Sequence, residues 1–391
     1  MAPRSRTLAV VALVAVHVLA AAAVLVRTDW TRRGFVSGDS LRYRAIARAG
    51  GWPYRDHAVE FPPVAWLAVK LVAAWGSPTT TATLLVLTQL AADLATAASL
   101  AWAWGRRAAL TWLALLLPLC WDGWIFARID LLSVGLATAG LALVWRGRPA
   151  GGGALIGTAA LVKAWAVTLV PGLAVVGRRV AATGAAVTVA AVGVSWLAVG
   201  GLDGVGQVVT FRGATGWQLE STVGALVHLF GDARPRGESG AWRIGVQPGW
   251  TKPVLAIGLV AVTTLGWWLA HRAHRRSRVD DPAFFHGAVI AVVALLVLAP
   301  ILSPQYLVWL LPFVAVLWRD RTLVALTAIA VVTTAVVAYG YTPLRRGELW
   351  LQLVLVGRNA LLVVIGVVTA SRLLRAARAE RTGQHRTASA A

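Results

Sequence analysis

The residues of this chain that are best suited to chemistry lie in one polar stretch, residues 30–63, within a sequence that is otherwise mostly apolar. The stretch holds three carboxylates, Asp39, Asp56 and Glu60, together with several arginines and an ending rich in aromatic residues and proline. Because it directly follows the first apolar run, we expect it at a membrane surface. Carboxylates held there can take part in recognition, or in a reaction that needs a general base.

Asp39 is the candidate for that base, because a carboxylate within hydrogen-bond reach of an attacking hydroxyl can accept its proton. Arg42 and Tyr43 follow it by three and four residues, so on a helix all three side chains share one face. A structural alternative stays open. Ser37 or Asp39 can cap a helix that runs to Ala49, as serine and aspartate often do.

The remainder of the polar stretch combines turn-forming and aromatic residues. Residues 51–57 read Gly-Trp-Pro-Tyr-Arg-Asp-His, and residues 60–63 read Glu-Phe-Pro-Pro, in which the prolines are typical of a helix start. Aromatic residues in such a place can also be ordinary residues of the membrane interface. From this region we take the candidates for contact with a sugar or an acceptor: Tyr43, Tyr54, Asp56, His57 and Glu60.

Basic side chains are the candidates for binding phosphate. Lys163 separates two apolar runs, at a depth where a charge is costly and usually faces a cavity or a partner. The alternative is that its ammonium group snorkels to the surface. Arg128 and Asp130, in the segment Phe-Ala-Arg-Ile-Asp, either pair with each other or border the same cavity. Since lysine and arginine both bind phosphate, the candidates in order are Lys163, Arg128 and Arg42.

A second polar region and one interrupted apolar run add three further candidates. Glu220 follows residues 212–213 and a tryptophan, and it either contacts a sugar or pairs with an arginine. Gln305 and Tyr306, in Ser-Pro-Gln-Tyr, either contact substrate or belong to a short outer turn. The sequence has no glycine-rich nucleotide loop, no Gly-x-Ser-x-Gly elbow and no Cys or His cluster with metal-ligand spacing. We therefore predict no cofactor, and an activated donor delivered within the membrane.

The composition predicts that membrane helices hold these residues. The 391 residues are 58% hydrophobic and 14% charged, and apolar runs near the spanning length of about 18 residues recur. The runs lack the alternation of an outer-membrane barrel. We predict an all-α polytopic membrane protein with about 12 transmembrane helices, at 7–26, 79–104, 108–121, 131–145, 152–162, 164–177, 180–200, 252–270, 285–301, 304–318, 322–341 and 349–370.

The distribution of charge predicts the orientation of these helices. The net charge of +21 would suggest nucleic acid in a soluble protein, but the basic residues lie mainly in short loops and tails, as the positive-inside rule requires. We therefore predict no nucleic-acid partner. With the basic clusters inside, loops 27–78 and 201–251 face outward and carry most of the outward acidic residues. Residues 1–375 then form one integral membrane domain, and 376–391 a disordered basic cytoplasmic tail.

Two local choices complete the topology. The run 64–76 is too short to span easily and follows two prolines, so we expect a juxtamembrane helix at the outer surface. The run 152–177 keeps its flanking arginines on one side only if it forms two short helices that turn near Lys163. Such broken helices are tolerated where they line a cavity walled by protein. The single cysteine, Cys120, allows no intrachain disulfide.

The order of these short motifs along the chain resembles that of a known family. In chain order, the motifs are Asp39-x-x-x-Tyr43, Gly51-x-Pro53-Tyr54, Glu60-Phe61-Pro62-Pro63, Arg128-x-Asp130, Lys163 before Pro171, Arg212-Gly213 before Gln218-x-Glu220-Ser221, and Ser303-Pro304-Gln305-Tyr306 with Trp309 and Pro312. In this order the chain resembles glycosyltransferase family 87, the actinobacterial mannosyltransferases of GT-C fold that use polyprenol phosphate mannose. Phe61 departs from the family's usual tyrosine, and Ser40 from its usual apolar or aromatic residue.

The resemblance implies a GT-C enzyme of the cell envelope, multi-pass in the cell membrane with its active site on the extracytoplasmic side. It implies transfer of a hexose, mannose, from a polyprenyl-phosphate donor to a lipid or glycan acceptor, with inversion. Asp39 would deprotonate the acceptor, and Lys163, Arg128 and Arg42 would stabilise the leaving phosphate. Two alternatives remain: a GT-C transferase using another lipid-linked sugar such as arabinose, or a transporter or flippase of a lipid-linked substrate. A transporter would place its charges at the midplane in repeat-related helices.

Overall fold

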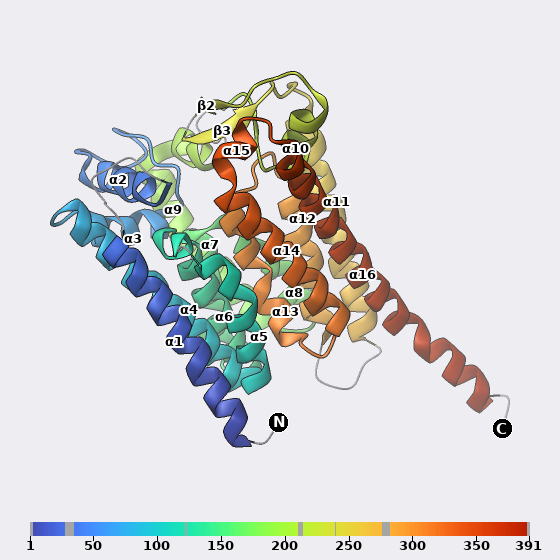
Figure 1. Cartoon of the computed structure of the whole chain (residues 1–391). Coiled ribbons are helices and arrows are strands. Elements are labelled where there is room, and N and C mark those ends of the chain that lie inside the picture. The colour runs from blue at the N-terminus through green and yellow to red at the C-terminus, as the bar shows by residue number, and fades with distance from the viewer. Residues whose placement is uncertain are drawn as a thin grey trace. The chain divides into compact units, whose positions relative to one another are not determined.

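The computed structural model describes residues 3–27, 35–121, 123–209, 214–238, 240–275 and 282–388. Within these residues the chain is predominantly helical and has little sheet, which confirms the predicted all-α class (Figure 1). The fold divides into two compact units, which we describe separately. The first comprises Met1–Val167, Thr183–Thr215 and Glu238–Gly240, and the second comprises Thr168–Ala182, Gly216–Gly237 and Ala241–Ala391.

Two sets of apolar helices can be distinguished by length among the described residues. Six are long and apolar enough to cross a membrane, by length and composition: Leu8–Val26, Pro78–Trp104, Arg179–Val208, Thr251–His274, Arg321–Tyr339 and Leu349–Arg378. The shorter apolar helices are Pro63–Ala73, Asp130–Trp145, Pro149–Val162, Ala164–Val175, Pro282–Leu298 and Pro304–Val316. The structure thus supports a membrane protein. The predicted count of about 12 spans stays a prediction, because it includes helices of the shorter class.

The first unit is built around one long helix. The elements of this unit are α1 (Pro3–Arg27), α2 (Phe35–Arg48), α3 (Pro63–Ala73), α4 (Pro78–Trp104), α5 (Arg106–Cys120), η1 (Trp124–Ala127), α6 (Asp130–Trp145), α7 (Pro149–Val162) and most of α9 (Arg179–Val209). The Ser77 hydroxyl caps α4 by accepting from the Thr80 N–H at 3.1 Å. Helices α1, α2, α3, α5 and α6 all pack against α4, so α4 is the common support of the polar segments.

A buried polar network fixes α1 to α4 and α5. His17 Nδ1 lies 2.6 Å from Asp93 Oδ2, and His17 Nε2 lies 3.0 Å from the carbonyl oxygen of Leu113. Trp112 Nε1 donates to the other oxygen of Asp93 at 2.8 Å. Since a carbonyl oxygen only accepts, Nε2 carries a proton in this arrangement. Both Asp93 oxygens are therefore satisfied inside the helix bundle, as buried polar groups require.

Glycines allow α6 and α7 to approach each other at backbone distance. A Cβ atom added at Gly140 would lie 2.6 Å from the carbonyl oxygen of Gly152. A Cβ added at Gly157, further along α7, would lie 2.6 Å from the carbonyl oxygen of Ala185 in α9. Small residues at helix crossings are typical of membrane proteins. They hold α7 firmly up to its end, where Lys163 follows.

The predicted break near Lys163 and the predicted short helix after the polar stretch are both confirmed. Lys163 has extended backbone angles, φ −145° and ψ 122°, and terminates α7. The chain continues as η2 (Ala164–Thr168) and then as α8 (Leu169–Val175). Helix α3 has Pro63 in its first turn, where the missing N–H costs nothing. That α3 lies at the outer surface of a membrane stays a prediction.

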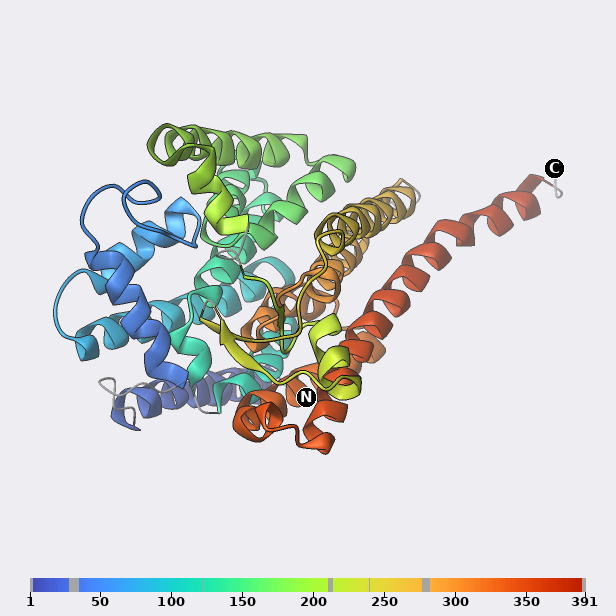
Figure 2. The ribbon, with the colours of Figure 1, turned by 90° about the horizontal axis from the view of Figure 1, so that it is seen from above.

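The second unit contains α8, β1 (Trp217–Gln218), α10 (Thr222–Phe230), most of β2 (Arg236–Glu238), β3 (Ala241–Ile244), α11 (Thr251–His274), α12 (Pro282–Leu298), η4 (Pro304–Trp309), α13 (Leu311–Val316), α14 (Arg321–Tyr339), α15 (Tyr341–Arg345) and α16 (Leu349–Ala388). The strands form a small sheet of order β1-β3-β2, in which Trp217 faces Ile244 in antiparallel register. Helix α12 packs against both α11 and α16. The structure carries α16 through residues 376–388, where the sequence predicts disorder, and its last turns extend beyond the other helices of this unit (Figure 2).

Candidate active site

Helix α2 presents Asp39 to a cation from another part of the first unit. Asp39 is the fifth residue of α2, which begins at Phe35, so the interpretation of Asp39 as the cap of this helix is wrong. Its carboxylate forms an ion pair with Arg128. Arg128 stands in extended conformation between η1 and α6. The structure therefore brings together the predicted base and one of the predicted phosphate-binding residues.

A second ion pair, between Arg42 and Glu60, lies one helical turn further along α2. Glu60 precedes the prolines that start α3. The Arg42 guanidinium also lies over the ring of Phe61, 5.8 Å from its centroid, at a distance suited to a cation–π contact. Arg42 thus contacts two consecutive residues of the segment that leads into α3.

Lys163 and Asp130 form a third pair at the same ring. Lys163 Nζ lies 3.6 Å from Asp130 Oδ1 and 5.9 Å from the centroid of Phe61. Asp130 is the first residue of α6, where a carboxylate is favoured by the helix dipole, and it is almost fully buried. The sequence offered Arg128 and Asp130 as partners of each other. In the structure, Arg128 pairs with Asp39 and Asp130 pairs with Lys163. All three predicted phosphate-binding side chains therefore face carboxylates of this unit.

The three ion pairs and Phe61 together form what we call the ion-pair site. It consists of Asp39 with Arg128, Arg42 with Glu60, and Asp130 with Lys163, and the cations of the last two pairs lie over the ring of Phe61. Its formal charge is balanced, with one cation for each carboxylate. A bound anion would therefore have to compete with a carboxylate for each cation.

Two tyrosines set the position of Phe61. The Tyr54 hydroxyl donates to the carbonyl oxygen of Phe61 at 2.7 Å. Burial raises the pKa of Tyr54, which keeps this hydroxyl a donor at all ordinary pH values. The Tyr43 ring packs edge-on against the Phe61 ring, with centroids 5.7 Å apart. Both tyrosines are buried in one cluster with Phe61, so Phe61 is held by contacts within the core of this unit.

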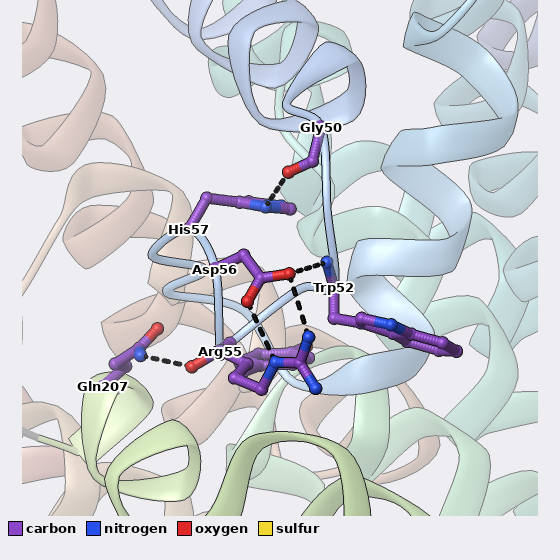
Figure 3. A network of polar contacts seen from close by, with 7 residues as sticks. Gly50, Trp52, Arg55, Asp56, His57 and Gln207 are labelled. Carbon is purple, nitrogen blue, oxygen red and sulfur yellow. Dashed lines mark hydrogen bonds and ion pairs between the residues drawn. The ribbon is translucent and has the colours of Figure 1, made fainter.

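Asp56 and His57 stabilise the turn that precedes this segment (Figure 3). The Trp52 N–H donates to Asp56 Oδ2 at 2.7 Å, and Arg55 forms an ion pair with the same carboxylate at 2.9 Å. The hydrogen bond from Arg55 is the main reason why the pKa of Asp56 lies below its usual value. His57 Nδ1 lies 3.1 Å from the carbonyl oxygen of Gly50. These contacts order the turn on the exposed side of the segment.

The remaining candidates belong to the second unit. Glu220 is buried, and burial raises its pKa to about 7. The carbonyl oxygen of Glu220 accepts from Arg358 Nη2 at 2.7 Å, and its side chain is hydrogen-bonded by Tyr341 and Gln218. Gln305 is buried in η4, and the Tyr306 ring stacks on Trp309 with centroids 4.2 Å apart. Residues 212–213 lie outside the described part of the chain.

Sequence reasoning missed two residues that organise these regions. Gln207, near the end of α9, bonds to the turn that contains Tyr54. Arg358 lies within the apolar run of α16 and is fully buried. A charge in such a run is a signal in itself, and it could have identified Arg358. Among the described residues, no group of three or more His, Cys, Asp or Glu side chains is placed to hold a metal ion.

Comparison with known proteins gives one result. The family model described as glycosyltransferase family 87 matches residues 58–304, which is more than half of the chain. The matched segment includes Glu60, Arg128, Asp130, Lys163 and Glu220, and Asp39 precedes it. No curated protein matches the chain.

Proposed function

Because the chain belongs to glycosyltransferase family 87 and is therefore a transferase with a sugar donor and an acceptor, we propose that it moves a hexose, mannose, from a polyprenyl-phosphate donor to a lipid or glycan acceptor. The reaction takes place at the extracytoplasmic face of the cell membrane and inverts the anomeric carbon. The apolar helices provide the membrane environment that a polyprenyl donor needs.

One observation carries the proposal: the Asp39 carboxylate and the Arg128 guanidinium are in direct contact. A displacement at the anomeric carbon needs a base at the attacking hydroxyl and positive charge at the leaving phosphate. The ion-pair site supplies both within one cluster. Lys163 and Arg42 add two further cations next to the same Phe61 ring.

The proposed mechanism begins with an exchange of ion pairs. The donor phosphate binds Arg128 and Lys163, and in doing so separates Arg128 from Asp39. The released Asp39 carboxylate then accepts the proton of the acceptor hydroxyl. As the new bond forms between that oxygen and the anomeric carbon, the bond from the anomeric carbon to the phosphate oxygen breaks. Polyprenyl phosphate leaves with the electron pair, and the cations stabilise its charge.

The test is transfer by membranes of cells that express the wild type or Asp39→Asn, with radiolabelled polyprenyl phosphate mannose and endogenous lipid acceptors. Asp232→Asn makes the same chemical change at an exposed carboxylate and serves as the matched control. We expect label in lipid or glycan with the wild type and the control only. Transfer by Asp39→Asn at the rate of the wild type would remove Asp39 from the role of base. Transfer by no protein would exclude this donor and lead to other lipid-linked sugars.

A further inference from the structure

The segment that carries Glu60 and Phe61 is held from a distant part of the sequence by one side-chain amide. Gln207 Nε2 donates to the carbonyl oxygen of Tyr54 at 2.9 Å (Figure 3). Gln207 Oε1 accepts from the backbone N–H of Val59 at 2.9 Å. The amide therefore uses its donor and its acceptor on two backbone groups that flank the tip of one loop. All these residues belong to the first unit.

The end of α9 is shaped to receive this loop. Gly201 has a backbone angle φ of 62°, which interrupts the helix, and two glycines flank it. A Cβ atom added at Gly200 or at Gly204 would lie 2.7 Å or 2.9 Å from the Cβ of Tyr54. The Tyr54 ring packs against Trp196, with centroids 5.2 Å apart. The glycines thus form a notch that receives the Tyr54 side chain.

The backbone of Tyr54 adopts an unfavourable conformation at this contact. Its φ of 68° is the positive value that a non-glycine residue rarely adopts. Such a conformation is strained and persists only where the surrounding contacts hold it in place. The notch and the Gln207 hydrogen bonds supply those contacts. The loop is therefore held in one conformation by contacts with α9.

The contacts lead directly into the ion-pair site. Tyr54 donates its hydroxyl proton to the carbonyl oxygen of Phe61, and Val59 directly precedes Glu60, the partner of Arg42. Glu60 and Phe61 are thus fixed by contacts on both sides. Because Arg42 and Lys163 both lie over the Phe61 ring, the placement of these two cations depends on this segment.

We propose that Gln207 is a positioning residue of the transferase: through Tyr54 and Val59 it sets the position of Glu60 and Phe61, and so of the cations that bind the donor phosphate. The inference rests on the proposed function, because it names what the positioning is for. Gln207 does not contact substrate in this role. Loss of the Gln207 amide lets the segment move. Donor binding then weakens, whereas the rate of transfer within the bound complex changes less.

The first experiment compares Gln207→Leu with the wild type in the transfer assay. We expect the KM for the polyprenyl-phosphate donor to rise at least fivefold, with a smaller change in kcat. The control is Ser195→Ala, since the Ser195 hydroxyl on the same helix bonds only to its own helix, at the Ala191 carbonyl. An unchanged donor KM in Gln207→Leu would overturn the inference. A fall in kcat with an unchanged donor KM would indicate only a loss of folded enzyme. That result would also overturn the inference.

Gln207→Glu provides a rescue that a merely structural role would not show. As a carboxylate it still accepts from Val59 but has no proton for the Tyr54 carbonyl, whereas as a carboxylic acid it regains a donor. We therefore expect the ratio of its donor KM to that of the wild type to fall as the pH is lowered from about 8 to about 5, towards the usual range for glutamate. A ratio that does not depend on pH contradicts the hydrogen-bonding role.

A measurement without turnover separates this inference from the proposed function. Val59 is fully buried and the natural cysteine, Cys120, is buried too, so in Val59→Cys a new thiol reports on release of the loop. We expect labelling of this thiol by a maleimide to be at least tenfold faster when Gln207→Leu is added. Equal labelling rates would refute the positioning role. Faster labelling in a protein that transfers no mannose would support the positioning role of Gln207 and refute the proposed donor.

Discussion

The ion pair between Asp39 and Arg128 allows the sharpest test of the proposed mechanism, because its two partners are expected to affect donor binding in opposite directions. The Arg128 guanidinium lies against the Asp39 carboxylate, so a phosphate that binds Arg128 must displace this carboxylate. Asp39→Asn keeps the shape of the side chain and removes its charge. The variant therefore removes the competitor and leaves Arg128 to the phosphate.

The size of the effect follows from how far the pair is removed from water. The side chains of Arg128 and Asp39 are 13% and 19% exposed. An exposed ion pair is worth roughly 0–1 kcal/mol, and breaking a buried pair costs about 3–5 kcal/mol. We take roughly 1.5–3 kcal/mol for the competition, which means about ten- to hundredfold tighter binding of polyprenyl phosphate by Asp39→Asn. Transfer by the same variant should fall about 10²- to 10⁴-fold, the usual contribution of a general base.

Arg128→Gln should do the reverse. It removes hydrogen bonds from a charged group, each worth about 1.5–3 kcal/mol, and should weaken binding by roughly ten- to hundredfold. The assay is equilibrium binding of polyprenyl phosphate to purified protein in nanodiscs, followed by tryptophan fluorescence, with Asp232→Asn as the control. Binding that weakens equally in both variants would refute the exchange. Asp39 would then support Arg128 and not compete for it.

Three further predictions concern other parts of the molecule. Lys163→Ala should raise the donor KM by about fivefold or more, since a charge-assisted contact is lost, whereas exposed Lys252→Ala should leave it unchanged. His17→Leu should lower the free energy of unfolding in detergent by about 1–4 kcal/mol, because it leaves the buried Asp93 side chain without one of its hydrogen-bond partners; a second change, Asp93→Leu, should recover part of the loss. Burial raises the pKa of Glu220 from its usual 4.5 to about 7, so the stability given by its neutral form is present below about pH 4.5 and is lost as the pH rises through about 7. Glu220→Gln should therefore flatten the fall of the thermal midpoint between about pH 5 and pH 7, and an unchanged slope would show that Glu220 does not titrate there.

Features that depend on neighbouring residues could be predicted from the sequence. The prolines at 62–63 predict the start of α3, and its bounds confirm this. The break at Lys163 followed from the position of flanking arginines and the length of the run, and it is present. The family was also predicted from the order of short motifs, and the family model confirms it. Each of these signals is either local or spread along the chain in a fixed order.

Features that depend on the packing of distant segments could not be predicted in the same way. The sequence offered Arg128 and Asp130 as partners of each other, but choosing Asp39 and Lys163 instead requires knowing how α2, α6 and α7 meet. Gln207 gave no signal, because a single amide near the end of an apolar run is compatible with any surface position. Its two hydrogen bonds exist only because the glycines of α9 let Tyr54 approach.

In the proposed mechanism, the balanced charge of the ion-pair site links recognition of the donor to activation of the base. If the three cations stood without carboxylates, any anionic lipid headgroup could bind them, since such headgroups attract basic side chains. Each cation instead faces a carboxylate of the first unit, so a phosphate binds only if its other contacts offset the loss of an ion pair. The proposed donor would make such contacts through its sugar and its polyprenyl chain, and a bare headgroup would make fewer. The same displacement that selects the donor also frees Asp39, so the proposed base becomes available when the sugar to be transferred is in place.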